Sequence, residues 1–388
     1  MRTMALVGLM LLLLGKESMV ALAQDDYWLR KALKARQPEK KIEYFTKSIE
    51  TESTTAETYI LRGDVYWNLA IDAAYNSHLV VIVFDKDKAD FHNAKLMYGK
   101  ADDDYTKALE LDPDCAKAYF KRSDVHWQLG LKEKAIADLT ELIAVDPENT
   151  EAFLQRAFIY QNDFRDFEKA LADASRAIEI DPDHSAAYRA RGYYHYRLRQ
   201  NENSIADFNK SIEINPNDAY AYFHRGDVYR RTGQYEKAIS DYCRTIELDR
   251  KNFMAFNNRG LVYVILTQYE KALKDFKKAI SLNPSDFPNS YNNAGYVYLQ
   301  QDKIEPAIKY FNKCLSIEDK YFPAYLNLAL AYDSNGNTEK AQFNLERARS
   351  SAPFLEEGMD SVVKLNKDWY YWTEQDQDTL TKMLLELN

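Results

Sequence analysis

The sequence predicts an all-α fold, a solenoid of about nine helix–turn–helix units that fill nearly the whole chain. A pattern of small and aromatic residues recurs about every 34 residues, as in Ala219–Asn252 and in the segment that follows it. Two columns of this pattern stay small in eight units, and prolines recur where the units end. A fixed period of this length indicates stacked helical hairpins, each of which buries its apolar face only against its neighbours.

The two small columns predict close contact between the helices of each unit. The distance between packed helices depends on the side chains at the contact, so facing small residues allow close approach. Aromatic or apolar residues at positions 4, 11 and 24 of the unit then surround that contact. Position 8 is Gly63, Ser123, Ala157, Gly192, Gly226, Gly260, Gly295 and Ala329; position 20 is Ala101, Ala135, Ala170, Ser204, Ala238, Ala272, Ala307 and Ala341.

Proline at position 32 ends the second helix of most units, because proline cannot continue a helix. The prolines concerned are Pro113, Pro147, Pro182, Pro216, Pro284 and Pro353. They place regular units at 116–149, 150–184, 185–218, 219–252, 253–287, 288–321 and 322–355. Two of these units are one residue longer, in the turn 162–167 and in the loop 285–289.

The second unit, 56–115, contains about 26 additional residues. Small and aromatic residues keep alternating spacings of four and three along both arms, which predicts an extended antiparallel hairpin over about 71–98. Val81, Ile82 and Phe84 lie near its expected turn, in a run with more apolar residues than one stripe can bury. This tip either folds back on the solenoid or is exposed as a partner-docking surface.

The two ends of the chain differ from the repeats. Residues 1–23 resemble a secretory signal peptide, with Arg2, an apolar run at 4–14 and Ala21-Leu22-Ala23 before Gln24. We therefore expect an exported protein, periplasmic or secreted, with no membrane span in the mature chain; the alternative is that the segment is kept as an uncleaved anchor. The solenoid is expected over 24–353. Residues 354–388, with an aromatic cluster at 369–372, are expected to form capping helices that cover the open end of the core.

Arginine at position 7 and aspartate at position 23 occur together in units two to seven and are lost together in units eight and nine. The pairs are Arg62 with Asp104, Arg122 with Asp138, Arg156 with Asp173, Arg191 with Asp207, Arg225 with Asp241, and Arg259 with Asp275. One buried partner left alone would be costly, so joint presence and joint loss predict an ion pair within each unit. We assign this ladder to structure.

Composition argues against several classes of function. The net charge of −9 disfavours general nucleic-acid binding, which needs a basic surface. No HExxH, CxxC, nucleophile-elbow or phosphate-loop motif occurs, so we expect neither an enzyme nor a metal or other cofactor. His126 and His195 replace the aromatic residue at position 11 and are expected to be packing residues.

The repeats resemble the tetratricopeptide repeat (TPR), which implies a right-handed α-solenoid. In that family, positions 2, 5, 6, 9, 12 and 13 of the first helix line a concave groove. Carried onto units five and six, these positions include Arg189, Tyr193, Tyr196, Arg197, Tyr220, Phe223, Asp227, Arg230 and Arg231. Guanidinium groups beside aromatic surface suit a peptide with carboxylates and bulky side chains.

Position 6 of units seven to nine is asparagine: Asn258, Asn293 and Asn327. An amide offers a donor and an acceptor and could hold a peptide backbone. The row is similar to the asparagine ladder in the TPR superhelix of O-linked N-acetylglucosamine transferases, although ordinary repeats also carry Asn there. We expect these groove side chains to face solvent, so that replacing them leaves the fold intact.

The sequence thus predicts a non-catalytic scaffold that binds a protein or peptide segment in its groove. The alternative is a chaperone-like holder of unfolded exported proteins, resembling nine-repeat lumenal co-chaperones but without their His-Pro-Asp motif. The oligomeric state stays open.

Overall fold

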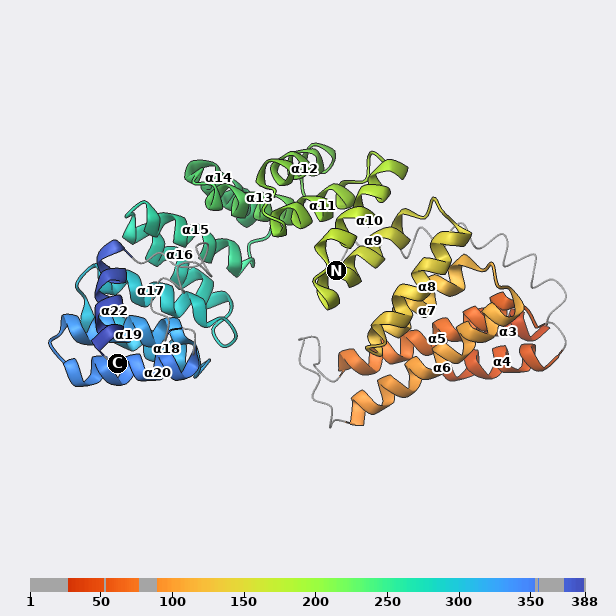
Figure 1. The fold of residues 1–388 in the computed structure, drawn as a ribbon. Helices are drawn as coiled ribbons and strands as arrows, with labels where there is room; N and C mark the ends of the chain where they lie inside the picture. Colours follow the sequence, from red (N-terminus) through yellow and green to blue (C-terminus); the bar gives the residue numbers. More distant parts are fainter. Residues whose placement is uncertain (1–26, 52–53, 77–88, 353–354, 356–372, 387–388) are drawn as a thin grey trace. The chain divides into compact units, whose positions relative to one another are not determined.

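The computed structural model describes residues 27–51, 54–76, 89–352, 355 and 373–386, and every regular element within them is helical, as predicted (Figure 1). The chain divides into two compact units, one ending at Asp183 and the other beginning at His184. The expected signal peptide at 1–23, the tip residues Val81, Ile82 and Phe84, and the aromatic cluster at 369–372 lie outside the described residues.

The first compact unit consists of helical pairs, each packed against the next along the chain. Its elements are α3 (Tyr27–Lys34), α4 (Pro38–Glu50), α5 (Ala56–Asn76), α6 (Ala89–Leu111), α7 (Ala116–Gln128), α8 (Lys132–Val145), α9 (Thr150–Ile159), the π-helical turn η1 (Tyr160–Phe164) and α10 (Phe167–Ile180). The long helices α5 and α6 pack along each other through small residues of the predicted stripe, among them Ala70, Ala73 and Ala94.

The second compact unit repeats the same arrangement and ends with one more helix. Its elements are α11 (Ser185–Arg197), α12 (Asn201–Ile214), α13 (Ala219–Arg231), α14 (Tyr235–Leu248), α15 (Phe253–Ile265), α16 (Tyr269–Leu282), α17 (Pro288–Gln300), α18 (Ile304–Leu315), α19 (Phe322–Ser334), α20 (Thr338–Ser351) and α22 (Glu374–Glu386). Together the described residues of both units form nine helical pairs, which confirms the solenoid of stacked hairpins.

The seven regular repeats begin at the residues that the period predicts, since α7, α9, α11, α13, α15, α17 and α19 start there. Side-chain caps fix several of these starts: Asn149 accepts from the Ala152 amide at 3.0 Å, and Asn252 accepts from the Ala255 amide at 2.9 Å. The additional residue of the fourth repeat is accommodated by η1, which ends at Arg165 in a left-handed conformation (φ 53°). Insertion of one residue into a helix commonly produces such a π turn.

Glycine at position 8 stands opposite an aromatic ring at position 24 of the same repeat. A Cβ on Gly260 would lie 2.7 Å from the Phe276 ring, and one on Gly295 would lie 2.6 Å from the Phe311 ring. Repeats with Ser or Ala at position 8 carry Leu or Ala opposite it: Ser123 with Leu139, Ala157 with Ala174, and Ala329 with Leu345. The residue at position 8 is therefore smallest in the repeats where the residue at position 24 is largest, as close packing requires.

All six predicted Arg–Asp pairs are present, with nitrogen–oxygen distances of 2.6 to 2.8 Å. A third contact, which the sequence analysis did not predict, joins the arginine to the preceding repeat. Arg225 donates from Nη1 to Asn209 Oδ1 at 2.7 Å, and Arg259 donates from Nη1 to Cys243 Sγ at 3.0 Å. Most of these arginines therefore join three helices through their hydrogen bonds, rather than two.

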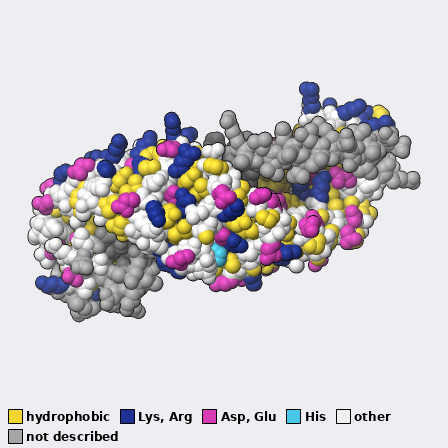
Figure 2. All heavy atoms as spheres, turned by 90° about the horizontal axis from the view of Figure 1, so that it is seen from above, with side chains coloured by type: hydrophobic (Ala, Val, Ile, Leu, Met, Phe, Trp, Pro, Cys, Tyr) yellow, Lys and Arg dark blue, Asp and Glu magenta, His cyan; other side chains and the backbone are white. Residues whose placement is uncertain are grey.

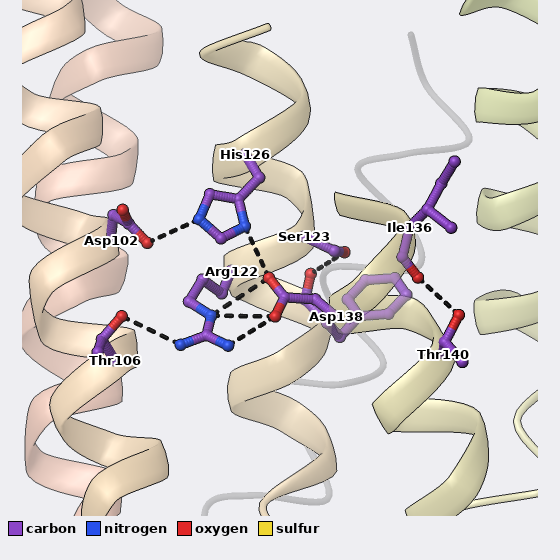
Figure 3. Close-up of polar contacts among 9 residues, drawn as sticks. Asp102, Thr106, Arg122, Ser123, His126, Ile136, Asp138 and Thr140 are labelled. Atoms are coloured by element: carbon purple, nitrogen blue, oxygen red, sulfur yellow. Dashed lines mark hydrogen bonds and ion pairs between the residues drawn. The ribbon is translucent and has the colours of Figure 1, made fainter. Parts of the chain in front are cut away.

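His126 extends this ladder in the first compact unit (Figure 3). Its Nδ1 lies 2.8 Å from Asp138, the partner of Arg122, and its Nε2 lies 3.2 Å from Asp102 on α6. Its side chain is buried, as expected of a packing residue, but it also bridges two carboxylates. Burial lowers the pKa of His126, but the bonds to Asp102 and Asp138 outweigh that effect and raise it to about 9.

The stability that protonated His126 contributes should depend on pH. Because its folded pKa is raised from about 6.5 to about 9, that contribution should be complete below pH 6.5 and lost as the pH rises through 9. His126→Gln removes the titration, so the difference in unfolding free energy between wild type and variant should shrink over this range. Denaturant titrations at several pH values measure it. A difference between wild type and His126→Gln that stays constant with pH would refute the bridge.

Candidate functional site: a groove on the first helices of the second unit

A cavity of about 970 Å³ lies on the second compact unit, lined mainly by the first helices of five repeats and the turns beside them. Ten of the twelve predicted groove residues line it: Tyr193, Tyr196, Arg197, Phe223, Asp227, Arg230, Arg231, Asn258, Asn293 and Asn327. Arg189 and Tyr220 do not. Arg189 pairs with Asp218 at 3.2 Å and lies over the Tyr220 ring, away from the cavity.

Arginines gather at one end of the cavity, where α11 and α13 terminate. They are Arg197, Arg199, Arg230 and Arg231. Arg197 donates to the Tyr193 hydroxyl at 2.9 Å, and Arg231 lies 3.9 Å over the centre of the Tyr196 ring. These aromatic and hydroxyl contacts hold the two guanidinium groups in place. Among the described residues, these four arginines and Lys320 line the cavity together with the carboxylates of Asp227 and Glu318.

Asp227 forms the floor beside these arginines and is buried. It accepts hydrogen bonds from Tyr242 Oη at 2.6 Å and from Asn258 Nδ2 at 2.9 Å. Burial lowers the pKa of Arg230, but Tyr242 and Asp227 outweigh that effect and keep the guanidinium protonated. Burial also lowers the pKa of the neighbouring His224, which favours its neutral form. Arg197 and Arg199, by contrast, are exposed at the rim.

The asparagine row does not face solvent as expected, because Asn293 and Asn327 are buried. Asn258 binds Asp227 on α13, and Asn293 Nδ2 donates to Asn257 Oδ1 at 3.0 Å. Asn327 Nδ2 donates to Asn292 Oδ1 at 2.9 Å. These amides join α13, α15, α17 and α19 across the floor of the groove. Their replacement by alanine should therefore reduce stability, since buried partners would lose a donor.

Apolar side chains line the other end of the cavity, which the sequence analysis missed. Met254, Phe287, Phe322 and Pro323 come from the amino-terminal ends of α15, α17 and α19 or from the turn before them, and Leu261 lies between the two ends. Met254 is 40% exposed, an unusual environment for so apolar a side chain. Met254 and Pro323 are at position 2 of their units and Leu261 is at position 9, but the full set of groove positions was carried onto units five and six only. Phe287 and Phe322 fall outside those positions.

Helix α22 packs against α19 and α20 and forms side-chain hydrogen bonds with α17 (Figure 1). Tyr296 of α17, at the repeat position that Tyr193 and Asp227 occupy in the groove, donates to Asp376 Oδ2 at 2.6 Å. Gln300 donates to the same carboxylate at 3.1 Å, and Leu380 and Leu384 are buried in the core of the last repeats. This helix adds apolar side chains to the core of the last repeats, and its Asp376 binds the groove-position side chain Tyr296 of α17.

Outside this groove, other kinds of site find little support among the described residues. No group of His, Cys, Asp and Glu there is arranged to hold a metal ion. No helix in the described ranges is both long and apolar enough to cross a membrane. The face drawn in Figure 2 mixes basic, acidic and apolar side chains and shows no broad patch of one charge.

Comparisons with known proteins agree with the repeat geometry. Family models described as tetratricopeptide repeat match residues 98–152, 156–219, 208–240, 253–286, 288–321 and 310–343, and one described as TPR repeat matches 226–266. No curated protein matches this chain in sequence.

Several solved structures are similar in fold. PilW, a type IV pilus biogenesis factor, is 19% identical, with a TM-score of 0.50 over 55% of this chain and 98% of PilW. YrrB, a TPR protein with an unusual peptide-binding site, is 22% identical, with a TM-score of 0.41 over 51% of this chain and 97% of YrrB. Helix boundaries, packing columns and family matches agree, and this chain belongs to the tetratricopeptide repeat family, whose members bind protein or peptide partners.

Proposed function

We propose that this protein is a non-catalytic scaffold that binds a segment of a partner protein in the groove of its second compact unit. The observation that carries the proposal is the cavity itself: ten residues chosen from repeat positions alone converge on it. The cavity combines aromatic surface, exposed guanidinium groups and a floor of fixed amides. Such a combination suits a peptide, which presents both side chains and a polar backbone.

Charge reversal at the exposed rim should weaken partner binding. Arg197→Glu with Arg199→Glu changes two solvent-facing side chains, so we expect at least tenfold weaker capture of a groove-bound partner, and a smaller effect of added salt than for wild type. Arg250→Glu with Lys251→Glu, exposed in the turn before α15, gives the same change in net charge away from the cavity. Affinity purification from the native host with quantitative mass spectrometry compares the three proteins.

The pattern of captured proteins distinguishes the candidate functions. One defined partner that is lost only with the rim variant supports a scaffold. Many unrelated clients would favour the chaperone-like alternative instead. A partner retained equally by all three proteins would move the binding site elsewhere, and turnover of a small molecule by the chain would contradict a non-catalytic role.

We further propose that the protein acts in an exported compartment, on the strength of the Ala21-Leu22-Ala23 sequence after a short apolar run. The chain isolated from its host should then begin at Gln24. Amino-terminal sequencing tests this, and a mature chain that retains Met1 would rule out export by cleavage at this site.

A further inference from the structure

The two ends of the groove lie at opposite ends of the first helices. The arginines stand where α11 and α13 terminate, whereas Met254, Phe322 and Pro323 stand where α15 and α19 begin. Contacts between successive first helices show that these helices lie side by side within the compact unit. A ligand that touches both ends must therefore cross the helices diagonally rather than follow one edge.

Helix α22 restricts a ligand to this diagonal path. It occupies the groove-facing side of Tyr296 and Gln300, toward the carboxyl-terminal end of α17, through the Asp376 carboxylate. A ligand that leaves the arginines and moves toward α19 can then continue only along the amino-terminal ends of α15, α17 and α19, where the apolar side chains lie. The middle of that path passes over Phe223 and Leu261.

On the basis of the proposed function, we infer that the bound segment is an extended peptide with Asp or Glu at one end and a large apolar side chain toward the other. The acidic end lies against Arg197, Arg199 and Arg231, and the apolar side chain lies against Met254, Phe287 and Phe322. From α13 to α19, three helix spacings of about 10 Å combine with a helix length of about 20 Å into a diagonal of roughly 35 Å, which an extended chain covers with about ten residues.

Charge complementarity favours this occupant over a basic or a wholly apolar segment. A guanidinium can donate two parallel hydrogen bonds to one carboxylate. Four guanidinium groups lie at one end of the cavity. The apolar end supplies thioether, ring and pyrrolidine surface from Met254, Phe287, Phe322 and Pro323, with the Asn289 amide and the Glu318 and Lys320 charges of opposite sign beside it. An acidic residue of the peptide placed at the apolar end would not contact this arginine cluster.

Peptide selection tests the inference directly. Random peptides of about ten residues, displayed on phage, are selected on the immobilised full chain, on Arg197→Glu/Arg199→Glu and on the matched Arg250→Glu/Lys251→Glu variant. Wild type and the matched variant should enrich peptides with Asp or Glu near one end and Leu, Met, Ile or Phe toward the other. The rim variant should not enrich them.

Calorimetry with one selected peptide then shows which end of the peptide contacts which end of the groove. Replacing its acidic residue by the amide should weaken binding to wild type about tenfold and weaken binding to the rim variant much less. Replacing its apolar residue by serine should also cost about tenfold, and much less when Met254→Asp already disrupts that end. Phe343→Asp, an exposed apolar residue on α20 outside the cavity, is the control for Met254→Asp and should bind the peptide normally.

The outcomes separate this inference from the proposed function. Peptides that need the rim arginines but lack an acidic end or an apolar end overturn the inference and leave the groove as a peptide site. An acidic fragment that binds as tightly as the whole peptide also overturns it, because the apolar end is then unused. If selection yields no peptide that distinguishes the rim variant from wild type, both the inference and the proposed groove are wrong.

Discussion

Replacing Arg225 with alanine is expected to lower the free energy of unfolding by about 3 kcal/mol. Its partner Asp241 is buried, and the two side chains meet at 2.7 and 2.8 Å through two nitrogens of the guanidinium. Burial raises the pKa of Asp241, and the bond to Arg225 opposes that shift. Removal of Arg225 leaves a desolvated carboxylate without its cation and also breaks the bond to Asn209.

A double-mutant cycle isolates the pair. Arg225→Ala combined with Asp241→Ala should cost clearly less than the sum of the single changes, because no buried charge is then left alone. Chemical denaturation of the full chain measures all four corners of the cycle. Arg244→Ala on α14 is the control, since its ion pair with Glu247 is exposed and its loss should change stability little. Additive losses would show that Arg225 and Asp241 do not stabilise the fold as a pair.

Replacing Gly260 with alanine should destabilise the protein by about 2 kcal/mol, although alanine normally favours a helix. The added methyl group would lie 2.7 Å from Cε1 of Phe276, which is fully buried and cannot move away freely. Phe276→Leu should relieve the clash, because the double variant reproduces the Ala329 and Leu345 combination of the last repeat. Its stability should then exceed the value expected from adding the two single losses.

Two other glycines set the scale for this experiment. A methyl group added to Gly99 on α6 would have no neighbouring atom within 4 Å, so Gly99→Ala should stabilise the helix by up to about 1 kcal/mol. Gly192 faces Phe208 at 3.1 Å, so Gly192→Ala should fall between Gly99→Ala and Gly260→Ala. Equal effects at Gly99 and Gly260 would mean that helix propensity, rather than the opposing ring, governs position 8. Thermal or chemical unfolding distinguishes these cases.

The repeat frame and the ion pairs follow from the sequence because they depend on residues of one repeat. The period places the first residue of seven first helices correctly, and the joint loss of Arg and Asp in two repeats identifies partners 16 residues or more apart. Ten of the twelve residues at groove positions carried over from the family lie among the 23 residues that line the cavity. Each of these features occurs at the same position in several repeats, so several repeats support the same interpretation.

Other features depend on contacts between repeats, and only the tertiary structure decides them. Asn293 and Asn327 hold groove positions, yet neighbouring first helices bury them and bind their amides. Phe287 and Phe322 lie outside the family's groove positions, yet they line the cavity beside the amino-terminal ends of α15, α17 and α19. Helix α22 is joined to α17 by the hydrogen bond between Tyr296 and Asp376, which are 80 residues apart in the sequence. Burial of a solenoid side chain is set by the adjacent repeat as much as by its own helix, and a period read from one chain does not contain that information.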